Sequence, residues 1–504
     1  MELTQADVRQ IVEQVVSNLT RGRQETCGTC QKSQTAAPER QPASIYNFNQ
    51  QVQPVRPTSA APARMGVYAD AQEAVERAHA AQQLYQKNFL VEDRKRIIDT
   101  IRMRVVEQKE TLARMAIEET GLGRYEDKVA KVELAALKTP GVEMLTTRAE
   151  SGDAGLTIEE MAPYGLIGAV SPVTNPMETL INNVIGILAG GNGVVYNVHP
   201  SSKRVCAYTV ELLNKAITEA GGPADLVTMV ENPTMESMDV IAKSPHTRLL
   251  LGTGGPGLVK ALLSSGKKAI GAAAGNPPVL VDDTADLELA AREIIKGASF
   301  DNNLLCISEK EVFVLEQVAD SLIFELIKQG AVMLTPQQAN QITELAMSRD
   351  EQGVWHTKKE WIGKDAGLFL EGAGIPGPRD VRLLIFEPGV GHPFVQLEQM
   401  MPVLPIVRVP DLDSGIRMAV EAEHGNRHTA SMFSKNVEHL TAFARAVETT
   451  IFVKNAATLA GVGYGGEGYT TFTIAGATGE GLTCAKTFTR FRRCVLAEGG
   501  FRIT

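Results

Sequence analysis

Cys306 is the residue of this chain best suited to act as a nucleophile. It lies in FDNNLLCISEK (residues 300–310), where a thiol follows short amides and apolar side chains, as at the end of a strand or in a tight loop. Only the thiolate attacks carbonyl carbon, and the amides of Asn302 and Asn303 with nearby backbone N–H groups could stabilise that charge. The upstream segment GAAAG (271–275) has no carboxylate to activate water. This combination indicates transfer of an acyl group to an acceptor other than water.

Asn175 is a second residue suited to carbonyl chemistry. It lies in SPVTNP (residues 171–176), between an expected strand and an apolar helix, with prolines at 172 and 176 restricting the backbone. An amide held in a fixed direction can donate to an oxyanion, which stabilises a transition state by about 2.7–4 kcal/mol. The same residue suits the N-cap of a helix that starts at Pro176. The two roles are compatible.

A glycine-rich segment, GTGGPG (residues 252–257), formally matches G-x-G-x-x-G. It follows the apolar strand RLLL (248–251) and opens a helical stretch, the context in which such glycines let the backbone approach a pyrophosphate. The acidic residue expected about 20 positions later for the ribose hydroxyls is absent. The segment therefore predicts either a loop that binds NAD in a non-standard manner or a simple glycine-rich turn. It is not a P-loop, because no G-K-[ST] follows at the required spacing.

Other thiols and histidines give weaker signals. His428 is predicted to be a hydrogen-bonded structural residue, with partnership to Cys306 as the alternative. Cys27 and Cys30 form a lone C-x-x-C, and two thiols cannot complete a zinc site, so we favour incidental thiols over a redox or metal role. We predict no metal site. Three further cysteines are expected to be small buried core residues: Cys206, Cys484 and Cys494.

Strands alternate with helices in the parts of the chain that must position these residues. Strands are predicted at 166–170, 193–198, 225–230 and 247–251. Helices are predicted at 71–85, 94–119, 176–188 and 202–220. A second α/β unit starts at PVLV (278–281) and runs to 480. Such alternation is typical of mostly parallel, doubly wound sheets. The segment 483–496 suits an exposed or intersubunit strand.

The first 64 residues differ from the body of the chain. Apolar residues recur at helical spacing in residues 1–19, which predicts an amphipathic helix. Residues 20–64 are rich in Gln, Thr, Ser, Ala and Pro and predict a flexible linker. A short helix needs a surface on which to bury its apolar stripe. It is therefore a docking peptide for a partner, or it folds back onto its own domain.

Composition excludes several classes of protein. The net charge of −9 argues against a nucleic-acid surface, which needs clustered Lys and Arg. No apolar stretch reaches the roughly 18 residues of a membrane span, and no secretory signal is evident. Six cysteines in 504 residues do not form a disulfide framework. We therefore expect a cytoplasmic protein with reduced thiols.

Taken together, these motifs resemble the aldehyde dehydrogenase superfamily, and within it the CoA-acylating branch of bacterial microcompartments. The resemblance covers residues 65–504 and includes ETGLGRYEDKVAK, SPVTNP, NVHPSSK, GTGGPG, AAAGNPPVLVDDTADL, GASFDNNLLCISEK, MMPVLPIVRV, TIFVKN and GGEGYTTFTIAGATGEG. It implies two doubly wound α/β domains and a small oligomerisation strand element: an NAD-binding domain at 65–270, a catalytic domain at 271–480 and an oligomerisation strand at 481–504. It also makes residues 1–19 similar to an encapsulation peptide.

The resemblance assigns roles to particular residues. Cys306 corresponds to the nucleophile and Asn175 to the oxyanion amide, while the general base of hydrolytic relatives falls at Ala272. Glu398 corresponds to the carboxylate that holds the nicotinamide ribose, and His199 falls where hydrolytic relatives have a lysine at the adenosine ribose. The remaining dinucleotide contacts are expected from Ser171, Pro172, Thr253, Gly254 and Gly255.

The implied reaction is oxidation of propionaldehyde or acetaldehyde by NAD+ through a Cys306 thioester, with transfer of the acyl group to coenzyme A. The implied partners are microcompartment shell proteins, bound through residues 1–19 inside the compartment, and a second or further copies in a homodimer or homotetramer. Two alternatives remain: a hydrolytic NAD-dependent aldehyde dehydrogenase, and a shell-binding structural protein with a degenerate site.

Overall fold

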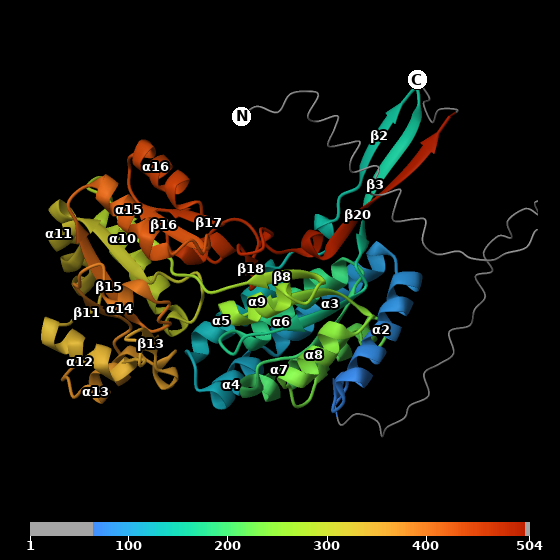
Figure 1. Cartoon of the computed structure of the whole chain (residues 1–504), viewed down its shortest axis with the longest axis horizontal. Coiled ribbons are helices and arrows are strands. Elements are labelled where there is room, and N and C mark those ends of the chain that lie inside the picture. Colours follow the sequence, from blue (N-terminus) through green and yellow to red (C-terminus); the bar gives the residue numbers. More distant parts are fainter. Residues whose placement is uncertain (1–63, 499–504) are drawn as a thin grey trace, which may run out of the picture. The chain divides into compact units, whose positions relative to one another are not determined.

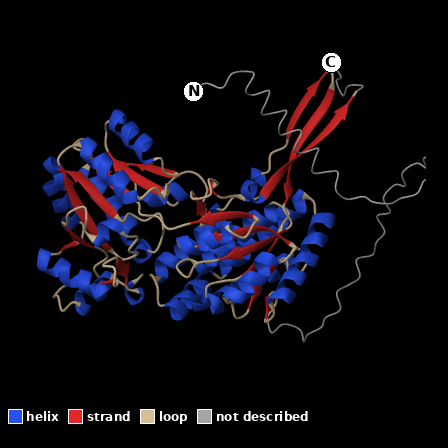
Figure 2. Ribbon diagram, in the orientation of Figure 1, coloured by secondary structure: helices blue, strands red, loops and turns tan. Residues whose placement is uncertain are grey.

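The computed structural model describes residues 64–498, so the predicted helix at 1–19 and nearly all of the predicted linker lie outside the described residues. Within the described part, two parallel sheets, each covered by helices on both faces, account for most of the chain (Figures 1 and 2). This is the doubly wound α/β architecture predicted from the alternation of elements.

The first sheet is entirely parallel, with the order β1-β6-β5-β4-β7-β8. Its strands are β1 (Val67–Tyr68), β4 (Leu166–Val170), β5 (Gly193–Tyr196), β6 (Val227–Val230), β7 (Thr247–Thr253) and β8 (Lys268–Ala272). The four predicted strands are confirmed. They are continuous apolar runs because a parallel sheet with helices on both faces leaves neither face to water.

Helices from both faces bury this sheet. They are α2 (Ala71–Asn88), α3 (Val91–Glu107), α4 (Lys109–Thr120), α5 (Tyr125–Lys138), α6 (Pro176–Ala189), α7 (Lys203–Glu219), α8 (Met235–Lys243) and α9 (Pro256–Leu263), with short 3-10 turns η1 (Val142–Met144) and η2 (Pro200–Ser202). Leu166 packs with α2 and α8, whereas Ile167 packs with α6 and α7, as the alternation of a strand requires. The predicted helix at 94–119 is two helices, because the backbone leaves helical geometry at Gln108.

The second sheet is also parallel, with the order β11-β14-β15-β10-β9-β16-β17. Its strands are β9 (Pro278–Val281), β10 (Glu311–Leu315), β11 (Val332–Met333), β14 (Leu384–Phe386), β15 (Val403–Val409), β16 (Thr429–Phe433) and β17 (Ile451–Lys454). Its helices are α10 (Leu287–Ser299), α11 (Glu316–Lys328), α12 (Pro336–Ala346), α13 (Ala366–Gly372), α14 (Pro393–Gln396), α15 (Leu412–Glu423) and α16 (Val437–Val447). Alternate residues of β9 pack against α10 and against α15, so both faces are buried.

A third, antiparallel sheet contains the C-terminal strand. It joins β2 (Arg148–Gly152) and β3 (Gly155–Pro163) to β20 (Thr489–Ala497), which pairs with β3 along its whole length (Figure 1). The predicted strand at 483–496 therefore begins six residues late, after the 3-10 turn η6 (Ala485–Phe488). Cys494 lies on β20 and is exposed, so the expectation of a buried core thiol is wrong there; Cys206 and Cys484 are buried as expected.

The chain returns to the first sheet after β17. It passes through η5 (Thr458–Val462), β18 (Ile474–Ala475) and β19 (Gly481–Leu482). Asn182 of α6 donates to the Thr470 carbonyl, and Thr473 donates to Asn183. Residues 470–488 thus pack against the helices of the first sheet, although the predicted catalytic domain runs to residue 480. The two remaining strands, β12 (Met347–Arg349) and β13 (Trp355–Thr357), form a small hairpin beside η4 (Lys359–Trp361).

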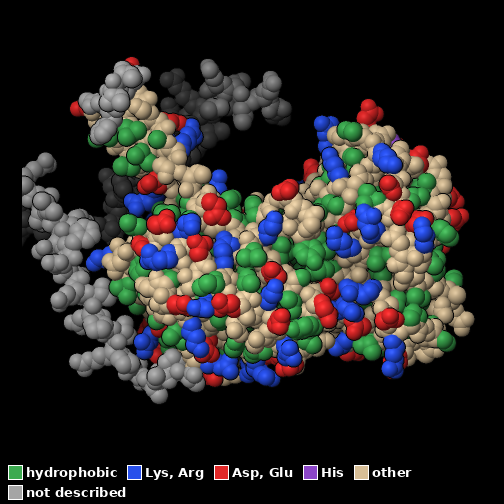
Figure 3. All heavy atoms as spheres, turned by 180° about the vertical axis from the view of Figure 1, so that it is seen from behind, with side chains coloured by type: hydrophobic (Ala, Val, Ile, Leu, Met, Phe, Trp, Pro, Cys, Tyr) green, Lys and Arg blue, Asp and Glu red, His purple; other side chains and the backbone are tan. Residues whose placement is uncertain are grey.

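Basic and acidic side chains are interspersed on the face of the molecule in Figure 3. No helix among residues 64–498 combines the length and the apolar character that crossing a bilayer requires.

Candidate active site

A pocket of about 280 Å³ lies where the carboxyl ends of β4, β7 and β8 face the loop that carries Cys306. Ligands of doubly wound folds bind at this edge, next to the point where strand order reverses, here between β4 and β7. Eight of the nine predicted site residues line the pocket: Pro172, Asn175, His199, Thr253, Gly254, Gly255, Cys306 and Glu398.

An adjoining cavity of about 780 Å³ holds the ninth predicted residue, Ser171, and continues from His199 and the 253–255 loop. Met235, Met238 and Leu258 give it apolar walls between α8 and α9. The Ser171 hydroxyl is buried and has no hydrogen-bond partner in the structure. A buried hydroxyl without a partner is costly, so a ligand with hydrogen-bonding groups suits this cavity.

The loop before Cys306 is a run of three left-handed residues: Asp301, Asn302 and Asn303 have φ of 48°, 54° and 66°. Asp and Asn tolerate this conformation better than other residues with a Cβ. Asn302 Nδ2 donates to Gly363 O and to an oxygen of Asp365, each at 3.0 Å. Asn303 Nδ2 donates to the carbonyls of residues 298 and 309. Both amides therefore hold the loop, and the expectation that they donate to the thiolate is wrong.

Asn175 stands at the N-cap position of α6 but makes no capping hydrogen bond through its side chain. Its Oδ1 accepts instead from Lys131 Nζ at 2.6 Å. Its Nδ2 has a long contact of 3.3 Å to Thr174 Oγ1. Asn175 is buried, yet it lines the pocket, so its amide can serve a bound carbonyl oxygen.

Charges around Cys306 act in opposite directions on its thiol. The side chain keeps some exposure to the pocket. Burial and, next, the Glu398 carboxylate raise its pKa to about 12, against the lowering effect of Lys310 and Lys131. Lys310 is fully buried in the same loop, where its ammonium donates to the carbonyls of Asn303 and Leu305 at 2.9 and 3.3 Å. Without ligands, the site therefore keeps Cys306 protonated.

We expect Glu398→Gln to lower the pKa of Cys306, because the substitution removes a negative charge that disfavours the thiolate. The rate of Cys306 alkylation by iodoacetamide should then rise at a lower pH than in the unmodified protein. Peptide-resolved mass spectrometry across a pH series measures this, with Glu371→Gln, an exposed carboxylate on α13, as the control. An alkylation profile that stays in place or moves to higher pH would contradict the assigned effect of Glu398.

His428 lies close to Cys306 but does not line the pocket. A Cβ added at Gly275 would come within 2.8 Å of the His428 ring and 2.9 Å of the Cys306 carbonyl oxygen. His428 Nδ1 shares a hydrogen bond of 2.9 Å with Thr429 Oγ1, and burial lowers the pKa of His428 to about 4. The ring is therefore buried and neutral, with Nδ1 hydrogen-bonded and Nε2 without a partner among the described residues, and its structural role stays a prediction.

Side chains that no sequence motif indicated complete the site: Lys131 lies behind Asn175, outside the pocket lining, and others form the pocket wall. Lys131 comes from α5, within the matching segment ETGLGRYEDKVAK but without an assigned role. The apolar wall comes from residues far apart in sequence, whose meeting no local pattern predicts: Phe300, Leu459, Val462, Tyr464, Phe472 and Ile474.

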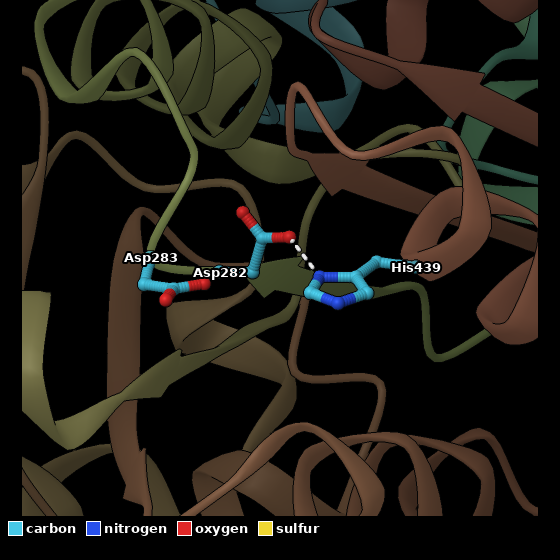
Figure 4. A group of neighbouring side chains, drawn as sticks. All are labelled: Asp282, Asp283 and His439. Carbon is cyan, nitrogen blue, oxygen red and sulfur yellow. Dashed lines mark hydrogen bonds and ion pairs between the residues drawn. The ribbon is translucent and has the colours of Figure 1, made fainter.

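Outside the pocket, Asp282, Asp283 and His439 form a group of side chains of types that bind metals, with ligand-type atoms within 4.8 Å of one another (Figure 4). Asp282 Oδ2 is already engaged by His439 Nδ1 at 2.7 Å and by Ser434 Oγ at 2.5 Å. Its Oδ1 accepts from Thr284 Oγ1. We therefore interpret the group as a hydrogen-bond network that ties the end of β9 to α16.

The chain belongs to the aldehyde dehydrogenase family, whose sequence pattern it matches over residues 43–483. Two similar proteins are an acetaldehyde dehydrogenase (acetylating), EutE, of Escherichia coli and a propanal dehydrogenase (CoA-propanoylating) of Salmonella typhimurium. The first is 46% identical over 447 residues, which is 88% of this chain and 95% of that protein. The second is 44% identical over 443 residues, or 88% and 94%.

Solved structures agree with this chain in fold. A propionaldehyde dehydrogenase from the fucose utilisation microcompartment of Clostridium phytofermentans is 47% identical, with a TM-score of 0.84 over 86% of this chain and 99% of that one. A propionaldehyde dehydrogenase of Rhodopseudomonas palustris is 48% identical with a TM-score of 0.83 over 86% of this chain, and its structures hold propionyl-CoA in one case and CoA with an acylated cysteine in another.

Proposed function

We propose that this protein oxidises a short aldehyde with NAD+ through a thioester on Cys306 and passes the acyl group to coenzyme A. The observation that carries the proposal is one pocket that contains a thiol, an amide donor and an alanine (Cys306, Asn175 and Ala272). The resemblance places the base of hydrolytic relatives at about Ala272. Among the described residues that line the pocket, Glu398 is the one carboxylate. The names of the similar proteins support CoA as the acceptor.

The proposed chemistry follows from these side chains. The Cys306 thiolate adds to the aldehyde carbon, and the oxyanion accepts from Asn175 Nδ2 and the Cys306 backbone N–H. Bound NAD+ supplies the hydride acceptor. As the adduct collapses, a thioester forms on Cys306. The CoA thiolate then attacks the thioester carbon and Cys306 leaves as thiolate. This exchange is nearly isoenergetic, so the site must position CoA more than supply acid–base catalysis.

The residues of the two cavities fit a dinucleotide. The cavity of about 780 Å³ offers an apolar slot between α8 and α9 for an adenine, with the buried Ser171 hydroxyl and His199 at its polar end. Gly254 and Gly255 lie where both cavities meet, before the N-terminus of α9, which suits a pyrophosphate. Glu398 lies beside Cys306 and suits a ribose hydroxyl.

The direct test is product analysis with acetaldehyde and propionaldehyde, with NAD+ or NADP+, and with or without CoA. We expect NADH and the matching acyl-CoA, both detected by mass spectrometry and absorbance. Free acid formed at the same rate without CoA would favour the hydrolytic alternative, and no turnover at all would favour a structural protein.

We also propose that residues 1–19 target the enzyme to the interior of a bacterial microcompartment. The support is their amphipathic pattern and the microcompartment origin of a similar enzyme. Deletion of residues 1–19 should leave kcat and KM unchanged within about two-fold, because the described residues that line the two cavities all lie between residues 134 and 474. The same deletion should release the enzyme from purified compartments. Continued co-purification of the shortened chain with shells would contradict the targeting proposal.

The sheet β2-β3-β20 is the proposed contact between copies. Phe491, Val495 and Leu496 of β20 are exposed, and apolar side chains gathered on one strand favour burial against another chain. We propose a homodimer or homotetramer that uses this sheet, which sedimentation of a Phe491→Asp variant tests.

A further inference from the structure

Lys131 of α5 contacts two parts of the site at once. Its ammonium lies 2.6 Å from Asn175 Oδ1 and 2.5 Å from Asp301 Oδ2, and it forms an ion pair of 3.1 Å with Glu178 Oε1. The side chains of Lys131, Asp301 and Glu178 are fully buried. Asp301 begins the left-handed run before Cys306, so one cation joins the amide donor to the nucleophile loop.

The contact with Lys131 decides which way the Asn175 amide faces. A lysine ammonium can only donate, so the oxygen of the amide must face Lys131 and the NH₂ group must face away from it. The reversed amide would leave a buried oxygen without its donor and would present an acceptor to any oxyanion in the pocket. Because Asn175 makes no capping hydrogen bond to α6, nothing in the helix itself fixes this orientation.

We propose that Lys131 is a positioning residue for the oxyanion site, which holds Asn175 with its Nδ2 directed at a carbonyl oxygen bound at Cys306. The inference rests on the proposed roles of Cys306 and Asn175, but it requires neither NAD nor CoA. The positioning role of Lys131 applies to any acyl compound that Cys306 attacks.

The charge of Lys131 persists in its buried position. Burial works against the ammonium, but the carboxylates of Asp301 and Glu178 outweigh it and raise the pKa of Lys131. Lys128, one turn earlier on α5, is equally buried and lies 3.2 Å from the same Asp301 oxygen, yet burial lowers its pKa. Among the described residues, the one hydrogen-bond partner of the Lys128 ammonium is Asp301, and no hydrogen bond joins it to Asn175. Lys128 is therefore a matched control.

The test is the acylation of Cys306 by p-nitrophenyl acetate without NAD or CoA. Cys306 first loses its proton to buffer base, in an assay run at alkaline pH. The thiolate attacks the ester carbon, an oxyanion forms, and its collapse expels p-nitrophenolate and leaves an acetyl thioester on Cys306. We expect Lys131→Met to slow the p-nitrophenolate burst by roughly a hundred-fold, the effect of a misplaced catalytic group, and by no more than the roughly thousand-fold effect of a lost oxyanion donor. Lys128→Met should slow it by about three-fold at most, since it leaves Asn175 in place.

A double-mutant cycle separates positioning from general structural damage. Removing the Lys131 charge also disfavours the Cys306 thiolate, so each burst rate is divided by the iodoacetamide alkylation rate of Cys306 in the same variant. If Lys131 acts through Asn175, Lys131→Met in an Asn175→Ala background should then slow the corrected burst by about two-fold at most, because residues that act as a unit are not additive. An equal loss in both backgrounds, or no loss in the unmodified background, would overturn the proposal. Should Lys131→Met fail to fold because Glu178 is left unpaired, Lys131→Met/Glu178→Gln is compared with Glu178→Gln in the same cycle.

The outcomes also separate this inference from the proposed function. A burst that depends on Cys306 and shows the expected coupling, in a protein that makes no acyl-CoA, would leave the positioning role intact and remove the dehydrogenase assignment. A burst that survives Cys306→Ala would overturn the positioning role.

Discussion

Replacing Cys306 with alanine is expected to lower NADH formation from propionaldehyde by roughly four orders of magnitude or more, because loss of a covalent nucleophile costs at least that much in comparable enzymes. No other described cysteine lines the pocket, since Cys206 and Cys484 are buried elsewhere and Cys494 lies on β20. The substitution removes one atom next to a cavity, so the folded state should be little affected. Initial rates at saturating NAD+ and CoA provide the measurement.

The matched control is Cys494→Ser, a thiol substitution outside the pocket. We expect its activity to stay within about two-fold of the unmodified enzyme, as for most exposed positions. A Cys306→Ala enzyme that retains a tenth of the activity would show that the chemistry proceeds without a thioester on this residue, and the proposed mechanism would then fail.

Without CoA, we expect each active site to form one NADH and then almost to stop. The thioester on Cys306 can leave only by attack of CoA or of water, and general-base activation of water contributes a factor of about 10²–10⁴. Ala272 cannot supply that base. The steady rate after the burst should therefore be slower than the CoA-dependent rate by roughly that factor. Stopped-flow absorbance gives the burst amplitude and both rates.

A substitution that should add hydrolytic activity tests the same prediction. Ala272 is buried at the end of β8 and lines the pocket, so Ala272→Glu should place a carboxylate near the thioester and increase CoA-independent turnover. The same substitution at the neighbouring pocket residue Ala273 is the control for added charge. Linear NADH formation at the full rate without CoA in the unmodified enzyme would exclude a CoA-dependent second stage.

Much of the fold was predictable because its strands are continuous apolar runs that end in recognisable segments. The predicted strand at 166–170 has the same bounds as β4, and the segment after it brings Asn175 to the pocket. The motifs could be placed together because parallel strands of one sheet all present their carboxyl ends at the same edge.

The rest depends on contacts between distant segments. The sequence predicts Asn302 and Asn303 as donors to a thiolate. In the structure their side-chain N–H groups donate instead to carbonyl groups around the loop. Lys131 lies on the buried stripe of α5 with Val132, and the ion pairs that hold its ammonium there form only where α5 packs against α6 and the loop at Asp301. Neither fact is encoded in a local period or motif.

The residues that form the apolar wall of the pocket come from a different part of the chain than the residues that act on the carbonyl. Leu459, Val462 and Phe472 come from the segment after β17. Lys131, Asn175 and Cys306 come instead from α5, the start of α6 and the loop after α10, respectively. Substitutions in the segment after β17 can therefore change the length of acyl chain that the enzyme accepts, while the residues that activate the carbonyl stay unchanged.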